Sequence, residues 1–507
     1  MSLRQKFIHS FGWQALNVFS QVVLQLIFIF VLARLITEEA FGVMAIALVV
    51  VGFIEIFSQI GIGPALIQRK QLTPEHLNGA FFISLLLGIL FTGGLYVAAP
   101  WVASYYDHEP LIDVLRWIGL SFLISALAIV PRSLIIKELA FKKLFIISAI
   151  AMGIGNLGVG VTLAMLGYDL WAYVFALLSQ NVIMTIGYWL AHRTKISFQM
   201  DATSMRDMIR YGGGSTLFNV FNYAATKIDT LIVGKFGADT AAVDDAMRWR
   251  NTGLYDRSVY IMGLPITVLG KLSDSVMFSG LSMLQDDQKR LRRALLSAIY
   301  HIGLLVIPGS AFMVIWADEI TVLFLSEKYV EAVPIVQILF VSVAFRSIIK
   351  VGDSVVRALD RVYTASLIKL LFLAMVGAGT YFGLTAGLEG VAWSIVVAVL
   401  VQFVLMMRLS LSLVGLSFAR MIRKLIPAVI VAIVVVFASL IARWMLTGFE
   451  ELRLLRIVSA VIINGGMLFV VAWFMPLFFR QGEDNVLQTI ARKLPVEALR
   501  RRWDSNV

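Results

Sequence analysis

Several long apolar runs of this sequence contain charged residues, and those residues are the best candidates for chemistry. In the run 332–356, Arg346, Lys350 and Asp353 recur at helical spacing and therefore share one helix face. A Lys, Arg or Asp at the centre of a membrane helix costs about 2.5–3.5 kcal/mol, so each needs a partner or a function. Because guanidinium and ammonium groups suit phosphate, we expect a cationic cavity for an anionic headgroup. Lys350 and Asp353 could instead form an intrahelical pair.

The stretch 211–237 carries a second polar face. Asn219, Tyr223 and Lys227 follow at steps of four residues in a segment that is long and apolar enough to cross a bilayer. A lipid-facing helix would not tolerate this stripe, so it should face protein or a wet cavity. Lys227 and the nearby Asp229 could contact substrate, or could equally form structural pairs with the other half of the protein.

The first apolar run, 8–33, resembles the stretch 211–237. Both contain the pattern Gly-x4-Asn-Val-Phe, and the first run adds a Gln/Asn stripe that includes Asn17 and Gln21. Each segment opens a group of six apolar runs, which predicts a parallel repeat with the binding site between its halves. The stripe could also serve as interhelical hydrogen bonding worth about 0.6–2 kcal/mol per bond.

These patterns predict a cavity that holds a diphosphate and sugars. Its predicted lining residues are Arg346, Lys350, Lys227, Arg257, Asn219, Tyr223, Asn17 and Gln21. The candidates for ion coupling are Glu55 and Asp229, although Glu55 could equally neutralise a lysine across the bundle. Nucleotide-binding, metal-binding and carboxylate-rich catalytic motifs are absent, so we expect no catalytic residue, no metal and no cofactor other than a coupling ion, Na⁺ or H⁺.

The composition identifies the class of protein that must position these residues. Of 507 residues, 59% are hydrophobic and 15% are charged, against roughly 25% charged in soluble domains. The net charge of +11 is spread through short loops instead of forming one patch, which argues against nucleic-acid binding. The absence of cysteine excludes disulfides and thiol chemistry. The chain is therefore expected to be a polytopic membrane protein.

Apolar runs of bilayer-spanning length predict an all-α integral membrane protein with about 14 transmembrane helices. The runs lie near 8–33, 41–64, 79–101, 111–131, 144–166, 169–191, 211–234, 252–276, 295–317, 332–356, 362–383, 388–412, 425–446 and 455–479. Lys and Arg concentrate in alternate loops, which places both termini in the cytoplasm by the positive-inside rule.

The repeat and the loop composition predict five parts of the chain. Two six-helix lobes are followed by an extra helix pair and by a tail whose apolar and basic residues recur at the spacing of an interfacial amphipathic helix. The predicted boundaries are an N-lobe at 1–193, a cytoplasmic linker at 194–210, a C-lobe at 211–415, the extra pair at 416–480 and the basic cytoplasmic tail at 481–507.

Four segments resemble a known family. LARLITEEAFGVMAIA (32–47), IGPALIQRKQLTPEHLNGAFF (62–82), KIDTLIVGKFG (227–237) and LQDDQKRLRRA (284–294) are similar to the polysaccharide and lipopolysaccharide exporters of the multidrug/oligosaccharidyl-lipid/polysaccharide superfamily, in the branch of the colanic-acid-type exporters. The sequence departs from the family pattern at Gln59, where an acid is common, and at Ser279, where Pro is usual.

The resemblance implies two pseudo-twofold six-helix lobes that form a V around a cavity, with two extra helices. It also implies a flippase of the bacterial inner membrane that moves an undecaprenyl-pyrophosphate-linked oligosaccharide to the periplasmic leaflet by alternating access. Membrane lipids and the polysaccharide polymerase machinery are the expected partners. A cation-coupled multidrug exporter is the alternative on the same scaffold. A membrane-embedded glycan ligase is a third hypothesis, which the short outer loops disfavour.

Overall fold

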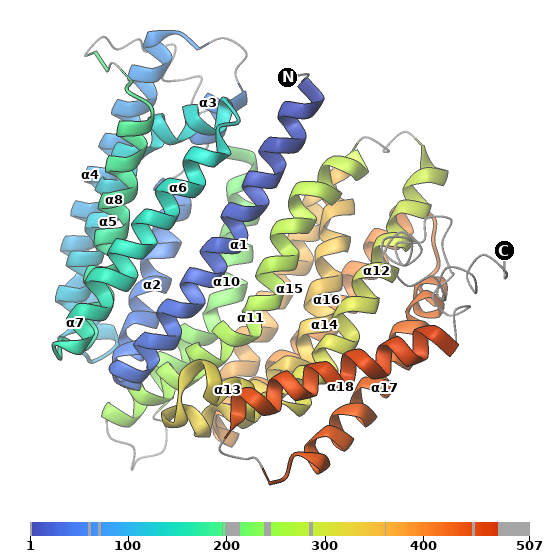
Figure 1. Ribbon diagram of the computed structural model, residues 1–507. Coiled ribbons are helices and arrows are strands. Elements are labelled where there is room, and N and C mark those ends of the chain that lie inside the picture. Colours follow the sequence, from blue (N-terminus) through green and yellow to red (C-terminus); the bar gives the residue numbers. More distant parts are fainter. Residues whose placement is uncertain are drawn as a thin grey trace. The chain divides into compact units, whose positions relative to one another are not determined.

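All regular structure in the described part of the chain is helical (Figure 1). The computed structural model describes residues 3–58, 62–68, 72–194, 196–197, 213–237, 245–282, 287–359, 361–448 and 452–474. The predicted linker and tail lie almost entirely outside these ranges, and the predicted boundaries between the lobes remain predictions.

Long helices alternate with a few short helical segments along the chain. In chain order they are α1 (Leu3–Leu35), α2 (Glu38–Ser58), α3 (Ile62–Gln68), α4 (Pro74–Tyr105), α5 (Leu111–Lys137), α6 (Phe141–Ala151), the π-helix η1 (Met152–Gly160), α7 (Val161–Met165), α8 (Leu170–Ala191), α10 (Gly213–Phe236), α11 (Asp245–Ser282), α12 (Gln288–Ile315), α13 (Ala317–Leu325), the 3₁₀-helix η2 (Glu327–Ala332), α14 (Val333–Ala358), α15 (Val362–Gly383), the 3₁₀-helix η3 (Leu384–Ala386), α16 (Gly387–Leu413), α17 (Phe418–Met445) and α18 (Arg453–Phe474).

A helix occupies each of the apolar runs that the sequence predicts to be helical. Among the described residues, ten helical stretches are long and apolar enough to cross a membrane, and one of these, Tyr363–Leu413, contains both α15 and α16. Backbone groups in a bilayer must be paired within the protein, which is why apolar runs of this length fold as helices. The all-α fold is therefore confirmed, and the number of crossings remains a prediction.

The start of α12 shows how local chemistry begins a helix. Asp287 precedes α12, and its carboxylate accepts a hydrogen bond from the backbone N–H of Arg290 at 3.0 Å. This bond satisfies one of the N–H groups that a helix leaves open at its start. It also holds the pKa of Asp287 below its usual value.

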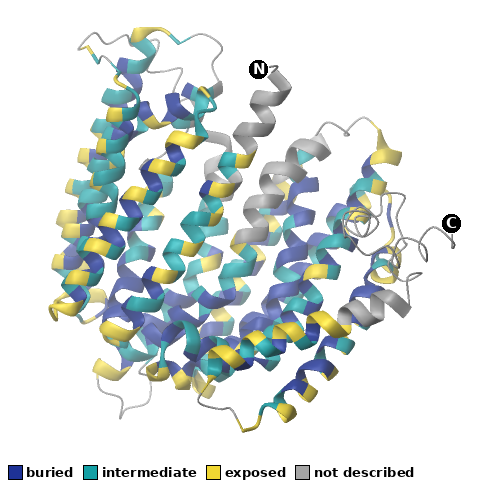
Figure 2. Cartoon of the chain, in the orientation of Figure 1, coloured by how far each residue is buried: buried dark blue, intermediate teal, exposed yellow. Residues whose placement is uncertain are grey.

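The chain forms two compact units. Unit 1 comprises Met1–Leu264, Phe324–Ile335 and Ser366–Ala398, and unit 2 comprises Pro265–Leu323, Val336–Ala365 and Val399–Val507. The division falls within α11, α13, α14, α15 and α16, and in α11 it coincides with Pro265, which removes a helical hydrogen bond. Figure 2 shows that buried residues occur along the helices of both units.

Within unit 1, the glycine-rich segment η1 packs closely on α8. A Cβ added to Gly155 would lie 2.5 Å from the backbone nitrogen of Gln180, and one added to Gly160 would lie 2.6 Å from the Cβ of Ala176. These small residues allow the two helices to pack closely. The π-helical geometry was not predicted, although π-bulges are a recognised way for a helix to absorb an extra residue.

Within unit 2, charged side chains connect α13 to α17 and α18. Glu319 is 1% exposed, and its carboxylate lies 3.1 Å from Nη2 of Arg456 and 3.8 Å from Nη2 of Arg443. Arg443 also binds Asp318 and the carbonyl of Ile315. The last helix pair is thus fastened by two acidic and two basic groups, which is how buried charges are retained in a folded protein.

Helices α2 and α11 approach each other through glycine. A Cβ on Gly42 would lie 2.0 Å from the carbonyl oxygen of Trp249, and a Cβ on Gly253 would lie 1.9 Å from that of Glu38. Both neighbours are backbone atoms, so no change of rotamer can make room. This contact brings the first half of α11 against the start of α2 in unit 1.

We expect Gly253→Ala to lower the midpoint of thermal unfolding of the purified protein, because overpacking a tight contact typically costs about 1–3 kcal/mol. Gly263→Ala is the matched control in the same helix, since a Cβ there meets nothing within 4 Å and Ala favours helix by about 0.8–1 kcal/mol over Gly. Equal midpoints for the two variants would contradict the proposed importance of this contact.

Candidate functional site

Tyr223 connects the polar face of α10 to α2. Its hydroxyl donates to the carbonyl oxygen of Val49 at 3.1 Å, and that of Leu48 lies at 3.4 Å. Gly52 makes the approach possible, because a Cβ there would lie 2.2 Å from the Tyr223 oxygen. Glu55, one turn further along α2, is exposed and close enough to interact electrostatically with Tyr223. The structure therefore brings two predicted site residues, Tyr223 and Glu55, to the same region.

Asp229 is buried in the outer half of α10, by the predicted orientation. Its side chain is 5% exposed and accepts hydrogen bonds at 2.8 Å from the Tyr255 hydroxyl and from the backbone N–H of Thr230. Tyr255 lies on α11, so the pair joins the two consecutive helices. A carboxylate held in this way has its charge compensated by donors inside the protein.

Arg257 is also buried, at 4% exposed, and is paired with its neighbour Asp256. Its Nε donates to the Asp256 carboxylate at 3.1 Å, and its guanidinium lies 4.6 Å from the ring centre of Phe41 and 5.0 Å from that of Tyr260. Aromatic faces and a carboxylate together stabilise a cation away from water. A contact between Arg257 and a substrate phosphate would require this pair to open, and it remains a prediction.

Asn17 and Gln21 form contacts within the first group of helices. Gln21 donates to the side-chain oxygen of Asn17 at 3.1 Å, and Ser148 of α6 donates to the same oxygen at 2.7 Å. Asn17 is 7% exposed. In the described structure Asn17 therefore forms the interhelical hydrogen bonding that the sequence left open as one alternative, whereas the bond of Gln21 lies within α1.

The α10 stripe has two further predicted site residues, Lys227 and Asn219. Lys227 is partly buried and forms no hydrogen bond or ion pair with any residue that the structure describes. The side chain of Asn219 lies outside the described residues. Their predicted roles remain untested.

The cluster on α14 belongs to unit 2. Arg346 and Lys350 are partly buried, and Asp353 is 6% exposed. Ser354 donates to the carbonyl of Lys350 at 3.0 Å, and the side chain of Arg357 approaches the carbonyl of Asp353 at 3.4 Å. The charges thus follow one another along a continuous helix, as their spacing predicts. Their contact with a substrate remains a prediction.

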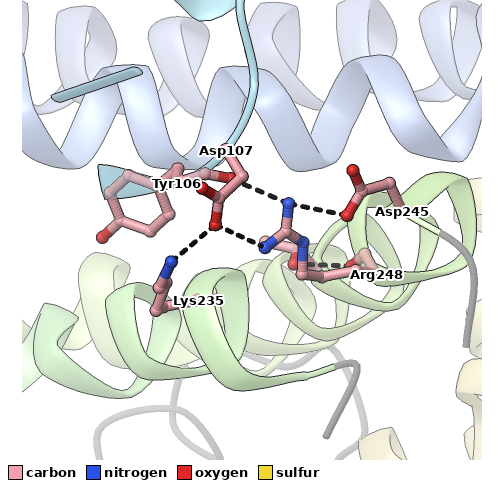
Figure 3. Close-up of polar contacts among 6 residues, drawn as sticks. Tyr106, Asp107, Lys235, Asp245 and Arg248 are labelled. Atoms are coloured by element: carbon pink, nitrogen blue, oxygen red, sulfur yellow. Dashed lines mark hydrogen bonds and ion pairs between the residues drawn. The ribbon is translucent and has the colours of Figure 1, made fainter. Parts of the chain in front are cut away.

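A cluster that the sequence did not single out lies where the α4–α5 loop meets α10 and α11. Asp107 of the loop receives a hydrogen bond from Lys235 at 2.7 Å and lies 4.0 Å from Nη1 of Arg248. Arg248 also donates to the carbonyl of Tyr106 at 2.8 Å and pairs with Asp245 at 3.0 Å. Figure 3 shows these five residues, which we call the Asp107 cluster.

The Asp107 cluster is ionic at neutral pH. The hydrogen bond and the positive charge of Lys235 hold the pKa of Asp107 below its usual value. Beside it, burial and the charge of Arg248 lower the pKa of His108, whose ring lies 4.4 Å from that of Trp249. Asp107 is therefore charged and His108 neutral under physiological conditions.

Further contacts of unit 1 occur on the same, predicted outer side. Arg250 of α11 pairs with Glu331 of η2 at 2.8 Å. The ammonium group of Lys328 lies 3.3 Å and 3.4 Å from the carbonyl oxygens of Arg34 and Ile36, at the end of α1. The sequence shows acidic and basic residues in the predicted outer loops, but it does not show which of them pair, because that depends on distances in the fold.

Comparisons with known proteins agree with this architecture. Residues 31–334 match the model of a family described as "Polysaccharide biosynthesis protein". The lipopolysaccharide biosynthesis protein WzxC of Escherichia coli is 23% identical over 355 residues, covering 69% of both chains. The teichuronic acid biosynthesis protein TuaB of Bacillus subtilis is 23% identical over 410 residues, covering 80% of this chain and 82% of its own.

Two solved structures share the fold. The lipid II flippase MurJ, in an inward closed conformation, has a TM-score of 0.70 at 15% identity and covers 92% of this chain and 99% of its own. A multidrug resistance MATE family transporter of the MOP superfamily, in an inward-facing conformation, has a TM-score of 0.64 at 15% identity, covering 79% of this chain and 98% of its own. These matches support a multi-pass membrane transporter fold.

The Asp107 cluster can be tested by cross-linking, because the chain has no cysteine of its own. We expect Asp107→Cys combined with Lys235→Cys to be joined by a short bifunctional thiol reagent in membranes. Adding Arg248→Gln should lower the yield several-fold, since Arg248 holds the loop through the Tyr106 carbonyl. Arg250→Gln is the control, because it removes a neighbouring arginine that binds η2. Adding it should leave the cross-linking yield unchanged. Equal yields in both backgrounds would show that Arg248 does not hold the loop.

The pH dependence of the cluster follows from the lowered pKa of Asp107. A carboxyl group with a depressed folded-state pKa stabilises the protein above its unfolded pKa, and the effect is lost as pH falls through the folded value. The unfolding midpoint of Asp107→Asn should therefore lie below that of the unchanged protein by the same amount from about pH 8 to about pH 5. The two midpoints should converge only below about pH 4. Convergence near neutral pH would instead implicate His108.

Proposed function

Because the chain belongs to the family of polysaccharide biosynthesis proteins, we propose that it transports a lipid-linked oligosaccharide from the cytoplasmic to the periplasmic leaflet of the bacterial inner membrane. The family match over residues 31–334 carries the proposal. The relatives named as biosynthesis proteins for lipopolysaccharide and teichuronic acid support it, as does a succinoglycan biosynthesis transport protein, ExoT of Rhizobium meliloti, at 22% identity over 65% of this chain. Transport, and not catalysis, is the proposed activity.

The proposed substrate is an undecaprenyl-pyrophosphate-linked oligosaccharide. MurJ, whose fold this chain shares, is named a lipid II flippase. A diphosphate carries concentrated negative charge and needs cationic donors when it leaves water. Arg346 and Lys350 are the best-placed cations of unit 2 for this role, because they lie one turn apart and partly buried in the middle of α14.

The proposed mechanism is alternating access driven by an ion gradient, with Na⁺ or H⁺ as the ion. Glu55 is the better of the two coupling candidates, since it is exposed near Tyr223, whereas Asp229 is buried and already holds Tyr255 and the Thr230 amide. The Asp107 cluster supports a conformation in which unit 1 is fastened on the predicted outer side. Opening toward the periplasm would require Lys235 and Arg248 to release Asp107.

The proposal can be tested with reconstituted protein and a fluorescent undecaprenyl-pyrophosphate-linked N-acetylglucosamine. A membrane-impermeant quencher reports the leaflet in which the probe resides. We expect the unchanged protein to equilibrate the probe and Arg346→Gln/Lys350→Gln to slow it by at least about tenfold, because a hydrogen bond to a charged group contributes about 1.5–3 kcal/mol.

The matched control is Arg361→Gln/Arg420→Gln, which removes the same net charge from two exposed positions. Unchanged flipping by the control and slow flipping by the α14 variant would support the site. Equal rates would contradict the role of α14, and an inactive unchanged protein would contradict flipping of this class of lipid.

A further inference from the structure

A partly open cavity of about 340 Å³ lies in unit 1 and is lined by residues of α2, α3, α4, α5 and α8. It occupies the predicted cytoplasmic half of the first group of helices, since its lining residues come from the second half of both α5 and α8. The volume is at the lower end of the range for small-molecule sites, roughly 300–1,000 Å³. The cavity therefore has room for a small part of an oligosaccharide.

The walls of the cavity combine apolar and polar side chains in similar numbers. Phe122, Ile129 and Met184 provide the apolar surface. Gly88 of α4 packs on α5, and a Cβ added there would lie 2.8 Å from that of Ala126, so the two helices are in contact beside the cavity. An apolar wall with a few converging polar groups is the usual composition of a ligand site.

Several polar groups of the lining have unused hydrogen-bonding capacity. The Asn181 side chain forms no hydrogen bond with any described residue, whereas its backbone carbonyl receives the Thr185 hydroxyl at 2.9 Å. The hydroxyl of Ser125, on the facing helix α5, likewise has no described partner. Ser125 is exposed and Asn181 is half-buried, so both side chains can offer a hydrogen bond to a ligand in the cavity.

The lining contains one basic and one acidic side chain, and both are exposed. Arg132 lines the cavity near Tyr188 and forms no ion pair or hydrogen bond with any described residue. The other ionisable group of the lining, Glu55, already interacts with other groups of the protein. A guanidinium presents a planar pair of N–H donors that matches a carboxylate.

We propose that this cavity binds one acidic sugar residue, a ring that carries a carboxylate, of the lipid-linked glycan. The carboxylate would bind Arg132, the ring hydroxyls would bind Asn181 and Ser125, and the apolar face of the ring would lie against the apolar wall. The inference rests on the proposed function, because it places part of the transported glycan in the first group of helices. It names a substrate class that the family match does not.

Thiol protection tests the inference, because the cysteine-free chain allows a single reporter. Ser125→Cys in the full-length protein should react with a methanethiosulfonate reagent, and glucuronate should slow the reaction. Glucose should protect at least about tenfold more weakly, since it lacks the charged partner of Arg132. Inorganic phosphate should protect more weakly than glucuronate, since it lacks the sugar ring that fills the cavity. The control reporter is Ser104→Cys, at an exposed position on α4 outside the cavity lining, which glucuronate should leave unaffected.

Second substitutions identify the groups responsible. In the Ser125→Cys background, Arg132→Gln and Asn181→Leu should each weaken protection at least about tenfold. The controls are Gln180→Leu, one residue away on α8, and Arg193→Gln, at an exposed position. Both should leave protection unchanged, since neither residue lines the cavity. Equal protection in all four variants would overturn the assignment.

The result is separable from the test of flipping. Flipping of the undecaprenyl probe without glucuronate protection would overturn the cavity inference and leave the proposed function standing. Glucuronate protection without flipping would overturn the proposed function and leave the cavity inference standing. Protection by phosphate equal to that by glucuronate would overturn the assignment to a sugar.

Discussion

Polar and charged side chains in apolar helices must find partners inside the protein, and the arrangement of unit 1 depends on that constraint. Asp229 on α10 holds Tyr255 on α11, and Tyr223 reaches a carbonyl of α2. Arg257 takes its compensation from Asp256 and from aromatic rings. Leaving any one of these groups unpaired would cost several kcal/mol in a medium without water. The polar residues of the central helices therefore specify which helices meet.

The helical fold was predictable from the sequence because it follows from one local property. A run of about 20 apolar residues has no other stable structure in a bilayer, so α10 and α12 occupy the runs predicted for them. The spacing of Arg346, Lys350 and Asp353 likewise determined that they share one face of α14. The family match includes the motif at residues 32–47. Such a motif can be recognised from the order of its residues, without knowledge of the fold.

Partners distant in the sequence could not be predicted in the same way. Asp107 and Lys235 are separated by 128 positions, and their contact depends on how the α4–α5 loop meets the end of α10. The ring centre of Phe41 lies 4.6 Å from the guanidinium of Arg257, a contact that the sequence does not reveal, and the predicted contact of Arg257 with a substrate remains a prediction. Asn181 escaped notice because one amide in an apolar helix carries no signal until the cavity beside it is known.

The cavity and the Asp107 cluster lie at different depths of the same pair of helices. The α4–α5 loop carries Asp107, and α5 begins at Leu111 and first lines the cavity at Phe122, roughly 16 Å further along at 1.5 Å per residue. Because Gly88 packs directly on Ala126, α4 and α5 cannot move apart locally without losing close contact. A ligand that moves both helices together as rigid bodies would therefore also shift the loop that Lys235 and Arg248 hold. Coupling between loading on one side and release on the other needs no further moving part than these two helices.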